Sequence, residues 1–221
     1  WGTLVAGDVV NIFYRSTPYT HNIMVFGIGT QTNPIIINGV TDSLGNRPQF
    51  NLTGSRTASG STTVSSTAYP EYGEGLGGIV LKRAKGATTG PKPEYITVKN
   101  IEVFGGSNGT KMTALNGAQF TRSGAAGIWC HDTKNCTIEN CVIYDNAFGV
   151  FVQAKNDVLA EANENITLRN NRIYLNGVVN SYLEHNVYMQ STSPVVEGNY
   201  IGSLRSGALG SSYKSDRKSV V

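Results

Sequence analysis

Two segments near the C-terminal end of the chain carry residue types suited to acid–base chemistry. Eliminative cleavage of an acidic sugar polymer needs a cation for the uronate carboxylate, a base for the C5 proton and an acid for the leaving oxygen. Arg217 could bind the carboxylate in bidentate fashion, and Lys214 or His185 could act as the base. Tyr188 could be the acid. These four residues form the predicted catalytic set.

A second group of candidate residues recurs at fixed positions in four strand-like segments, GIWCH, GVFVQ, NVYMQ and SYKSD. If alternate residues point inward, aromatic side chains and one lysine form an outward column beside a polar column. Exposed aromatic faces next to hydrogen-bonding groups suit a sugar polymer. The predicted substrate-binding residues are Trp129, Phe151, His131, Gln153, Gln190, Glu184 and Asp216.

Structural explanations stay open for several of these residues. His185 could be a satisfied polar residue at a corner of the chain, and Lys214 and Arg217 could simply solvate an exposed turn. Trp129 and Phe151 could lie under neighbouring loops and form a satellite core instead of a binding platform.

Two other chemistries are weighed against elimination. Glu184 and Asp216 could form a hydrolytic carboxylate pair. Asp132, Asp145 and Asp157 could contribute to a calcium site, but no ligand spacing supports one. No cofactor and no metal ligand are therefore predicted.

The elements that must position these residues repeat through the second half of the chain. Four segments align, YITVKNIEVF, NCTIENCVIY, NITLRNNRIY and PVVEGNYIG, at offsets of 40, 30 and 28 residues. The aligned columns are Val98, Ile138, Leu168 and Val196; Asn100, Asn140, Asn170 and Gly198; and Val103, Ile143, Ile173 and Ile201. Similarity at this period indicates a solenoid whose copies stack to bury a shared core.

The pattern within each copy selects the kind of solenoid. Apolar residues alternate with polar ones, as in a strand with one buried face, and Asn or Gly follows where the chain must bend. The regular leucine pattern of a leucine-rich repeat is absent. The sequence therefore predicts an all-β, right-handed parallel β-helix with three strands per coil and an asparagine ladder at one turn.

We expect a single β-helix domain over residues 1–221, with long loop excursions at 54–78, 83–94 and 154–164. Asn38-Gly39 predicts a turn after a strand at residues 35–37. The last residues begin a fifth copy with Val220, which predicts that C-terminal coils are missing or that a partner covers this end.

Composition limits the function classes. The chain has 221 residues, 26 glycines, 15% charged residues and a net charge of +3, far from the basic density of a nucleic-acid binder. No apolar run is long enough to span a membrane. Cys130, Cys136 and Cys141 suit small buried fillers of the stack, with a disulfide as the alternative, and their spacing is not that of a zinc site.

The opening LVAGDVVNI…PYTHNIMVFGIGTQTNPIIINGVTDSLGNRP and the later SYLEHNVYMQ…VVEGNYIG…GALGSSYKSDRKSVV resemble bacterial right-handed parallel β-helix repeat proteins of the pectate-lyase-like superfamily. The resemblance implies a secreted, cell-surface or periplasmic protein. In the lyases of this group a basic residue on a strand face acts as the base, often beside an arginine and calcium. Lys214 and Arg217 match by position, whereas the acidic calcium cluster has no clear counterpart.

Two hypotheses follow. The first is an extracellular lyase acting on an acidic polysaccharide. The second is a non-catalytic β-helix, such as a filament subunit, adhesin, tail protein or glycan-binding surface protein, that self-assembles through its solenoid ends or binds a glycan. The partners expected in either case are an anionic polysaccharide or further copies of the chain.

Overall fold

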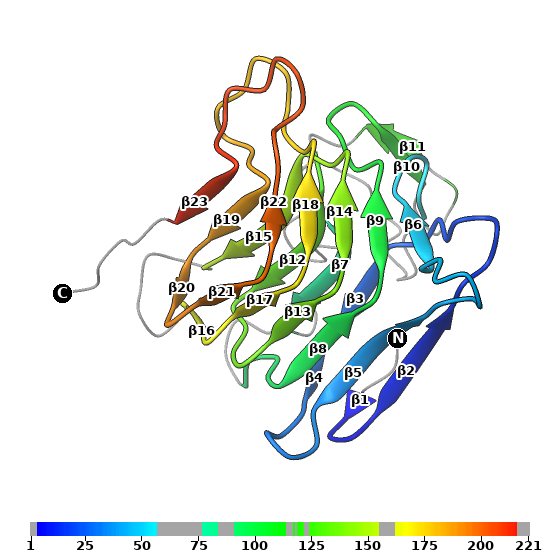
Figure 1. Ribbon diagram of the computed structural model, residues 1–221, viewed down its shortest axis with the longest axis vertical. Coiled ribbons are helices and arrows are strands. Elements are labelled where there is room, and N and C mark those ends of the chain that lie inside the picture. Colours follow the sequence, from blue (N-terminus) through cyan, green and yellow to red (C-terminus); the bar gives the residue numbers. More distant parts are fainter. Residues whose placement is uncertain are drawn as a thin grey trace.

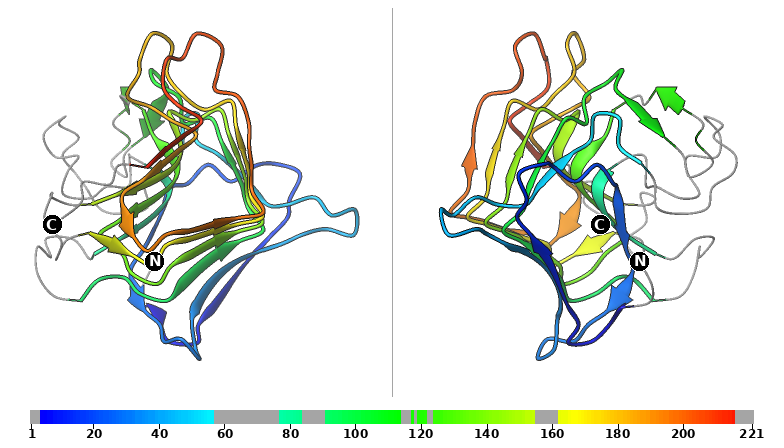
Figure 2. Two further views of the ribbon diagram at one scale, coloured as in Figure 1. Left: turned by 60° about the vertical axis from the view of Figure 1, so that its left-hand side comes forward. Right: turned by 90° about the vertical axis from the view of Figure 1, so that its right-hand side faces the viewer.

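The computed structural model describes residues 4–56, 77–83, 91–113, 117, 119–121, 124–154 and 162–215. In this part the chain winds into a right-handed parallel β-helix, and most of its strands form three long parallel sheets (Figures 1 and 2). The fold predicted from the repeats is confirmed. Within the described ranges, no helix has the length and apolar character needed to cross a membrane.

The first sheet contains the column of apolar residues that defined the repeat. Ile138 pairs with Val98 on one side and Leu168 on the other, and Leu168 pairs with Val196, so this predicted column is confirmed. The strands in spatial order are β2 (Val9–Phe13), β5 (Ile35–Val40), β8 (Ile96–Lys99), β13 (Thr137–Glu139), β17 (Thr167–Arg169) and β21 (Val195–Glu197).

The second sheet follows the asparagine turn of each coil. Ile143 pairs with Val103 and Ile173, and Ile173 pairs with Ile201, which confirms the other apolar column. Its strands are β6 (Gln49–Asn51), β9 (Glu102–Phe104), β14 (Val142–Tyr144), β18 (Arg172–Tyr174) and β22 (Tyr200–Ile201).

The third sheet carries the candidate functional residues. Its strands are β3 (Ile23–Val25), β7 (Gly77–Lys82), β12 (Ala126–His131), β15 (Phe148–Gln153), β19 (Val187–Met189) and β23 (Tyr213–Ser215). Shorter parallel pairs join β1 (Leu4–Val5) to β4 (Gly27–Ile28) and β16 (Asn163–Glu164) to β20 (Ser191–Thr192). An antiparallel pair joins β10 (Lys111–Thr113) to β11 (Gln119–Thr121).

The predicted excursions are only partly described. Residues 57–76, 84–90 and 155–161 lie outside the described residues. Of the predicted ranges, Gly77 and Gly78 already belong to β7, and Asn163 and Glu164 form β16.

The interior of the coils is a continuous apolar core. Its largest fully buried side chains include Phe50, Leu52, Ile79, Leu81, Ile128 and Ile138. All three cysteines are free and buried in it, and the thiols of Cys136 and Cys141 each donate to a backbone carbonyl at 3.3 Å. Burial raises the pKa of both thiols to about 12. The prediction that the cysteines fill the stack is confirmed.

The predicted asparagine ladder stands at the turn between the first and second sheets. Asn100, Asn140 and Asn170 have φ angles of 60°, 50° and 55°, and Gly198 continues the column at 64°. This left-handed conformation is one that asparagine and glycine tolerate best. Asn140 Nδ2 donates to Asn100 Oδ1 at 2.7 Å, so neighbouring coils are joined through their side chains.

A second asparagine ladder lies inside the coils, and the sequence analysis did not predict it. Asn146, Asn176 and Asn186 are fully buried; Asn146 lies between β14 and β15, and the other two lie in the next coil, at the two ends of the connection from β18 to β19. The Asn146 amide N–H donates to Asn176 Oδ1 at 3.0 Å, and the Asn176 N–H donates to Asn186 Oδ1 at 3.1 Å. These side chains provide hydrogen-bond partners for backbone N–H groups at a corner where strand pairing provides none.

The prediction of a turn at Asn38-Gly39 is wrong, because β5 continues through Val40. Asn38 is a rung of the outer ladder, accepting from Asn100 Nδ2 at 3.0 Å. Gly39 lies against the neighbouring coil, where a Cβ atom would overlap the carbonyl of Asn100. Glycine is therefore needed here for close approach between coils and not for a turn.

The outermost strands at both ends of the stack expose apolar side chains. Val9 and Phe13 of β2 are exposed at one end, and Val195 and Val196 of β21 at the other. Self-assembly through these ends stays a prediction, and the fifth copy with Val220 lies outside the described residues.

Asn146→Ala should lower the free energy of unfolding by about 2–4 kcal/mol, because buried partners lose hydrogen bonds. The partners are the Gly106 N–H, which donates to Asn146 Oδ1, and the Tyr144 carbonyl, which accepts from Nδ2. Denaturant unfolding measures the change. Asn108→Ala in an exposed turn is the matched control and should change stability by less than about 0.5 kcal/mol. Equal effects of the two variants would contradict a role for the interior ladder.

Candidate functional site

The outward face of the third sheet brings together residues that are far apart in the sequence. Trp129 pairs with Phe151, Phe151 with Tyr188, and Tyr188 with Lys214. The column predicted from alternation is therefore formed, with neighbouring members about 4.8 Å apart along the stack. His131 pairs with Gln153 in the same way, beside this column.

The rings of this face contact one another continuously. Trp129 and Phe151 stack with centroids 6.2 Å apart, and Tyr188 meets Phe151 edge-on at 5.4 Å. Lys82 Nζ lies 5.5 Å from the Trp129 ring, and Lys214 Nζ lies 5.6 Å from the Tyr188 ring, distances typical of cation–π contacts. We call this face the aromatic wall and define it as Lys82, Trp129, Phe148, Phe151, His185, Tyr188 and Lys214.

Trp129 is not an exposed platform, contrary to the prediction. Only 4% of this residue is exposed, and it packs with Val80 and Ala126 in a small cluster on the outside of the sheet. The satellite-core explanation therefore holds for Trp129. Phe151 and Tyr188 are half-buried, so parts of their rings remain accessible.

Phe148 is a member of the wall that the alternation rule missed. It stacks on Phe151 with centroids 4.3 Å apart, although the two residues are three positions apart in one strand. Strict alternation would put them on opposite faces. Gly149 breaks the alternation because it faces the core, where a Cβ would contact the Ile173 side chain closely.

The polar residues beside the wall differ in how firmly they are held. His131 meets the Trp129 ring edge-on at 5.1 Å. Gln190 Oε1 accepts the backbone N–H of Ala154 at 3.1 Å, which fixes its side chain. Gln153 is half-buried. Arg217 and Asp216, predicted for carboxylate binding and substrate contact, lie outside the described residues.

His185 occupies a buried corner at the edge of the wall. It is 2% exposed, and its ring stacks on Tyr188 at a centroid distance of 5.7 Å. Its Nδ1 accepts the backbone N–H of Ser211 at 2.8 Å. Its Nε2 has no hydrogen-bond partner among the described residues.

The surroundings of His185 favour the neutral imidazole. Burial and then the charge of Lys214 lower its pKa, and the carboxylate of Glu184 opposes them. Because Nδ1 accepts a hydrogen bond, the proton of the neutral ring lies on Nε2. His185 therefore presents a donor at Nε2. Glu184 Oε2 is also buried without a hydrogen-bond partner in the described part of the chain.

The carboxylates considered for calcium are occupied by cations of the protein. Asp132 is buried and pairs with Arg83 and Lys92, and Asp145 pairs with Arg205. Asp157 lies outside the described residues. In the described ranges, no three His, Cys, Asp or Glu side chains come together as a metal site.

A second aromatic stack, which the sequence analysis did not find, lies on the outward face of the second sheet. Tyr144 lies between Phe104 and Tyr174, with centroid distances of 5.2 and 5.4 Å and nearly parallel planes. Tyr144 also donates its hydroxyl to Glu102 Oε1 at 2.8 Å. Because both faces of the Tyr144 ring are covered, the middle of this stack stabilises the coils and offers only a ring edge to a ligand.

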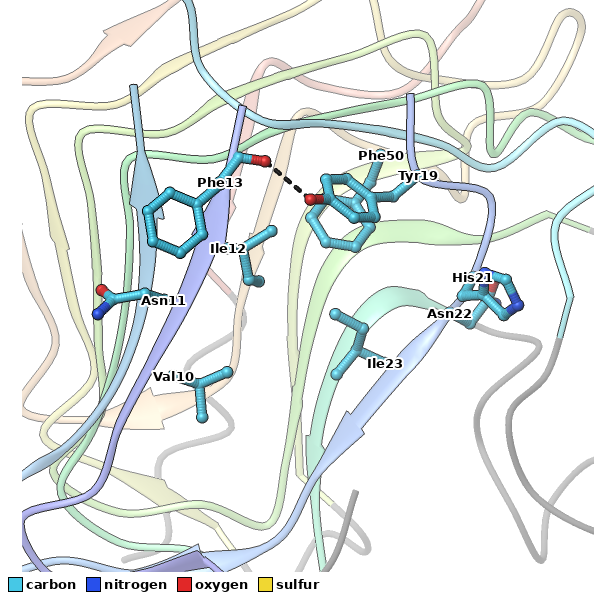
Figure 3. Close-up of a pocket in the computed structure, with 9 residues that line it drawn as sticks. All are labelled: Val10, Asn11, Ile12, Phe13, Tyr19, His21, Asn22, Ile23 and Phe50. Carbon is cyan, nitrogen blue, oxygen red and sulfur yellow. Dashed lines mark hydrogen bonds between the residues drawn. The ribbon is translucent and has the colours of Figure 1, made fainter. Parts of the chain in front are cut away.

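A pocket of about 360 Å³ opens at the β2 end of the stack (Figure 3). The Tyr19 ring stacks on Phe50 at 5.2 Å, and its hydroxyl donates to the carbonyl of Phe13 at 2.8 Å. The lining residues are Val10, Asn11, Ile12, Phe13, Tyr19, His21, Asn22, Ile23 and Phe50. The pocket is mostly apolar, and its residues Ile12, Ile23 and Phe50 belong to the core.

The pKa of His185 makes stability depend on pH. Because its folded-state pKa lies below the ordinary value of 6.5, the unfolded chain binds the proton more readily. The free energy of unfolding should therefore fall as the pH drops below about 6.5, and this fall should be smaller in His185→Gln. Denaturant unfolding between neutral and mildly acidic pH measures it. An NMR titration of His185 with a midpoint at or above 6.5 would contradict the expectation.

Comparison with known proteins agrees with the fold and with a location outside the cytoplasm. The model of a family described as "Periplasmic copper-binding protein (NosD)" matches residues 55–211. Searches of curated proteins and of solved structures returned no match. The resemblance to parallel β-helix repeat proteins is thus supported, while the narrower pectate-lyase-like assignment stays a prediction. Because the matched residues make up more than half of its length, the chain belongs to the NosD family of periplasmic proteins.

Proposed function

We propose that this chain is a periplasmic β-helix that binds an acidic polysaccharide along its aromatic wall. One observation carries the proposal: the half-buried rings of Phe151 and Tyr188 are continuous with the cation of Lys214 on one face. Ring faces and edges suit the C–H surfaces of sugars, and an exposed ammonium group suits a uronate carboxylate.

The dimensions and charge of the wall support a polymeric, acidic ligand. Four strand spacings separate β7 from β23, so the wall extends about 19 Å along the stack, enough for several sugar units. Lys82 and Lys214 stand toward its two ends. His131, Gln153 and Gln190 line one side and could hydrogen-bond to sugar hydroxyls.

The copper binding named in the family's description does not fit the donors in the described part of the chain. Copper favours thiolate, thioether or imidazole ligands. The thiols of Cys136 and Cys141 are buried, protonated and bound to carbonyls. No group of three His, Cys, Asp or Glu side chains suited to a metal occurs in the described ranges. The described residues therefore offer no copper site.

Tyr188→Ala and Lys214→Ala should each weaken binding to polygalacturonate by about 1–2 kcal/mol, because each removes a side chain from the accessible part of the wall. Titration calorimetry or affinity electrophoresis measures the change. Tyr174→Ala on the second sheet and Lys111→Ala on β10 are the matched aromatic and cationic controls. Equal losses in the control variants, or equal binding of neutral dextran, would contradict the proposal.

A second candidate function is eliminative cleavage of the bound polymer, favoured by the position of Lys214 over Tyr188. His185 Nδ1 is occupied by the Ser211 N–H and Nε2 carries the proton, so the base role falls to Lys214. Lys214, after releasing its own proton to solvent, would take the C5 proton, and Tyr188 would protonate the leaving oxygen.

Cleavage would generate unsaturated sugars, whose ultraviolet absorbance rises with time. If the chain is a lyase, Lys214→Ala should abolish this rise, and Lys111→Ala should leave it unchanged. A panel of uronate polymers that bind without any rise in absorbance would exclude the lyase and leave the binding function intact.

A further inference from the structure

His185 fastens the last strand of the third sheet to the preceding coil. Residues 202–212 connect β22 to β23, and Ser211 lies shortly before β23. The Ser211 N–H donates to His185 Nδ1 at 2.8 Å, and the carbonyl of the next residue, Ser212, accepts the Val187 N–H at 3.1 Å. These two bonds hold the entry to β23 against the start of β19.

The loop after β22 is seated directly on the backbone that carries His185. A Cβ atom added at Gly210 would overlap the Glu184 carbonyl oxygen and would lie 3.0 Å from His185 Nδ1. Glycine is therefore needed for this close approach. The other end of the loop is anchored separately, because Arg205 pairs with Asp145. The loop thus stays attached to the coils even when its contact with His185 opens.

β23 is the most exposed strand of the third sheet. It pairs with β19 on one side, and among the described residues no strand pairs with its other side. Its residues, Tyr213, Lys214 and Ser215, are all exposed. A strand with one paired edge and little burial opens locally at a small cost in free energy. The order of β23 therefore depends strongly on the contacts at its entry.

His185 makes its bond to Ser211 only while its imidazole is neutral. Because Nδ1 accepts a hydrogen bond, the neutral ring carries its proton on Nε2, and a second proton can bind only at Nδ1. A protonated Nδ1 is a donor and cannot face the Ser211 N–H. Nε2 has no hydrogen-bond partner among the described residues. The closed position therefore offers no acceptor to either N–H of a buried imidazolium, which is costly.

The groups around His185 act on the imidazolium in opposite directions. Burial removes its hydration and the charge of Lys214 repels it, and together they outweigh the attraction of the Glu184 carboxylate, so the pKa of His185 is lowered. The aromatic rings that contact the imidazole are those of Phe148 and Tyr188. Opening of β23 relieves both unfavourable effects, because it moves Lys214 away and lets water reach the ring.

We propose that His185 is a proton-operated latch for β23. At neutral pH the neutral ring holds Ser211, and the strand is ordered. In mild acid the ring takes a second proton from solvent at Nδ1, the bond to Ser211 breaks, and residues 210–215 detach from β19. Because Lys214 lies on β23, the latch decides whether this cation stands over the Tyr188 ring. The inference goes beyond polysaccharide binding and does not depend on it.

Hydrogen exchange followed residue by residue by NMR tests the latch. The protection factor of the Ser211 amide, which corrects for the intrinsic effect of pH on exchange, should fall by up to about tenfold for each pH unit below 6.5, because the open state binds the proton more readily. The Val150 N–H donates to the Asn186 carbonyl within the same sheet and should keep its protection. A loss confined to Ser211 and β23 distinguishes local opening from unfolding of the stack.

Three variants assign the effect to His185. His185→Asn keeps an acceptor oxygen at the δ position but cannot titrate, so Ser211 should stay protected in mild acid. His185→Leu has no acceptor, so Ser211 should lose protection even at neutral pH. His21→Asn is the matched control, because His21 is an exposed histidine at the β2 end of the stack, and it should retain the pH dependence.

The unmodified chain offers a second readout that needs no substitution. The ring-nitrogen shifts of isotope-labelled His185 should show the proton on Nε2 at neutral pH. A proton on Nδ1 under those conditions would overturn the latch. Constant protection of Ser211 in mild acid, a pH dependence that survives in His185→Asn, or an equal loss of protection at Val150 would each overturn it as well.

Discussion

The structure depends on backbone hydrogen bonds between coils that are stacked in register. Each strand of the three long sheets pairs with its counterpart in the next coil. A residue's neighbours are therefore set by its position within the coil, which we call its phase, and not by distance in the sequence. Asparagines at two corners keep that phase: an outer set in the left-handed conformation, joined side chain to side chain, and an inner set that satisfies corner amides. Because no coil can bury its apolar face alone, core, corners and outer surface are stabilised together.

The same stacking in register determines which side chains meet on the outer surface. Side chains such as Phe151 and Tyr188 form one continuous wall only because their strands pair in parallel. The chemistry of the wall is set by local burial: Trp129 is enclosed and adds stability, whereas Lys214 is open to solvent. The loop after β22 fixes His185 at the edge of the wall through the Ser211 N–H.

The fold could be predicted from the sequence because a stack repeats its pattern: Val98, Ile138, Leu168 and Val196 reveal their column by spacing alone. Alternation likewise predicted the pairing of Trp129, Phe151, Tyr188 and Lys214.

The alternation rule could not predict which outward side chains are buried or where the pleat of a strand is interrupted. Whether Trp129 is covered depends on packing outside the repeat, and Phe148 joins the wall because Gly149 reverses the side-chain direction. Asn38-Gly39 has the composition of a turn, yet its neighbours in the next coil keep it in a strand.

The most direct test of in-phase stacking is a nuclear Overhauser measurement on the labelled chain in solution. In-phase stacking predicts contacts from the Phe151 ring to both Trp129 and Tyr188, and from Leu168 to both Ile138 and Val196. Contacts from these residues to other neighbours, with the predicted ones absent, would contradict the stack and with it the aromatic wall.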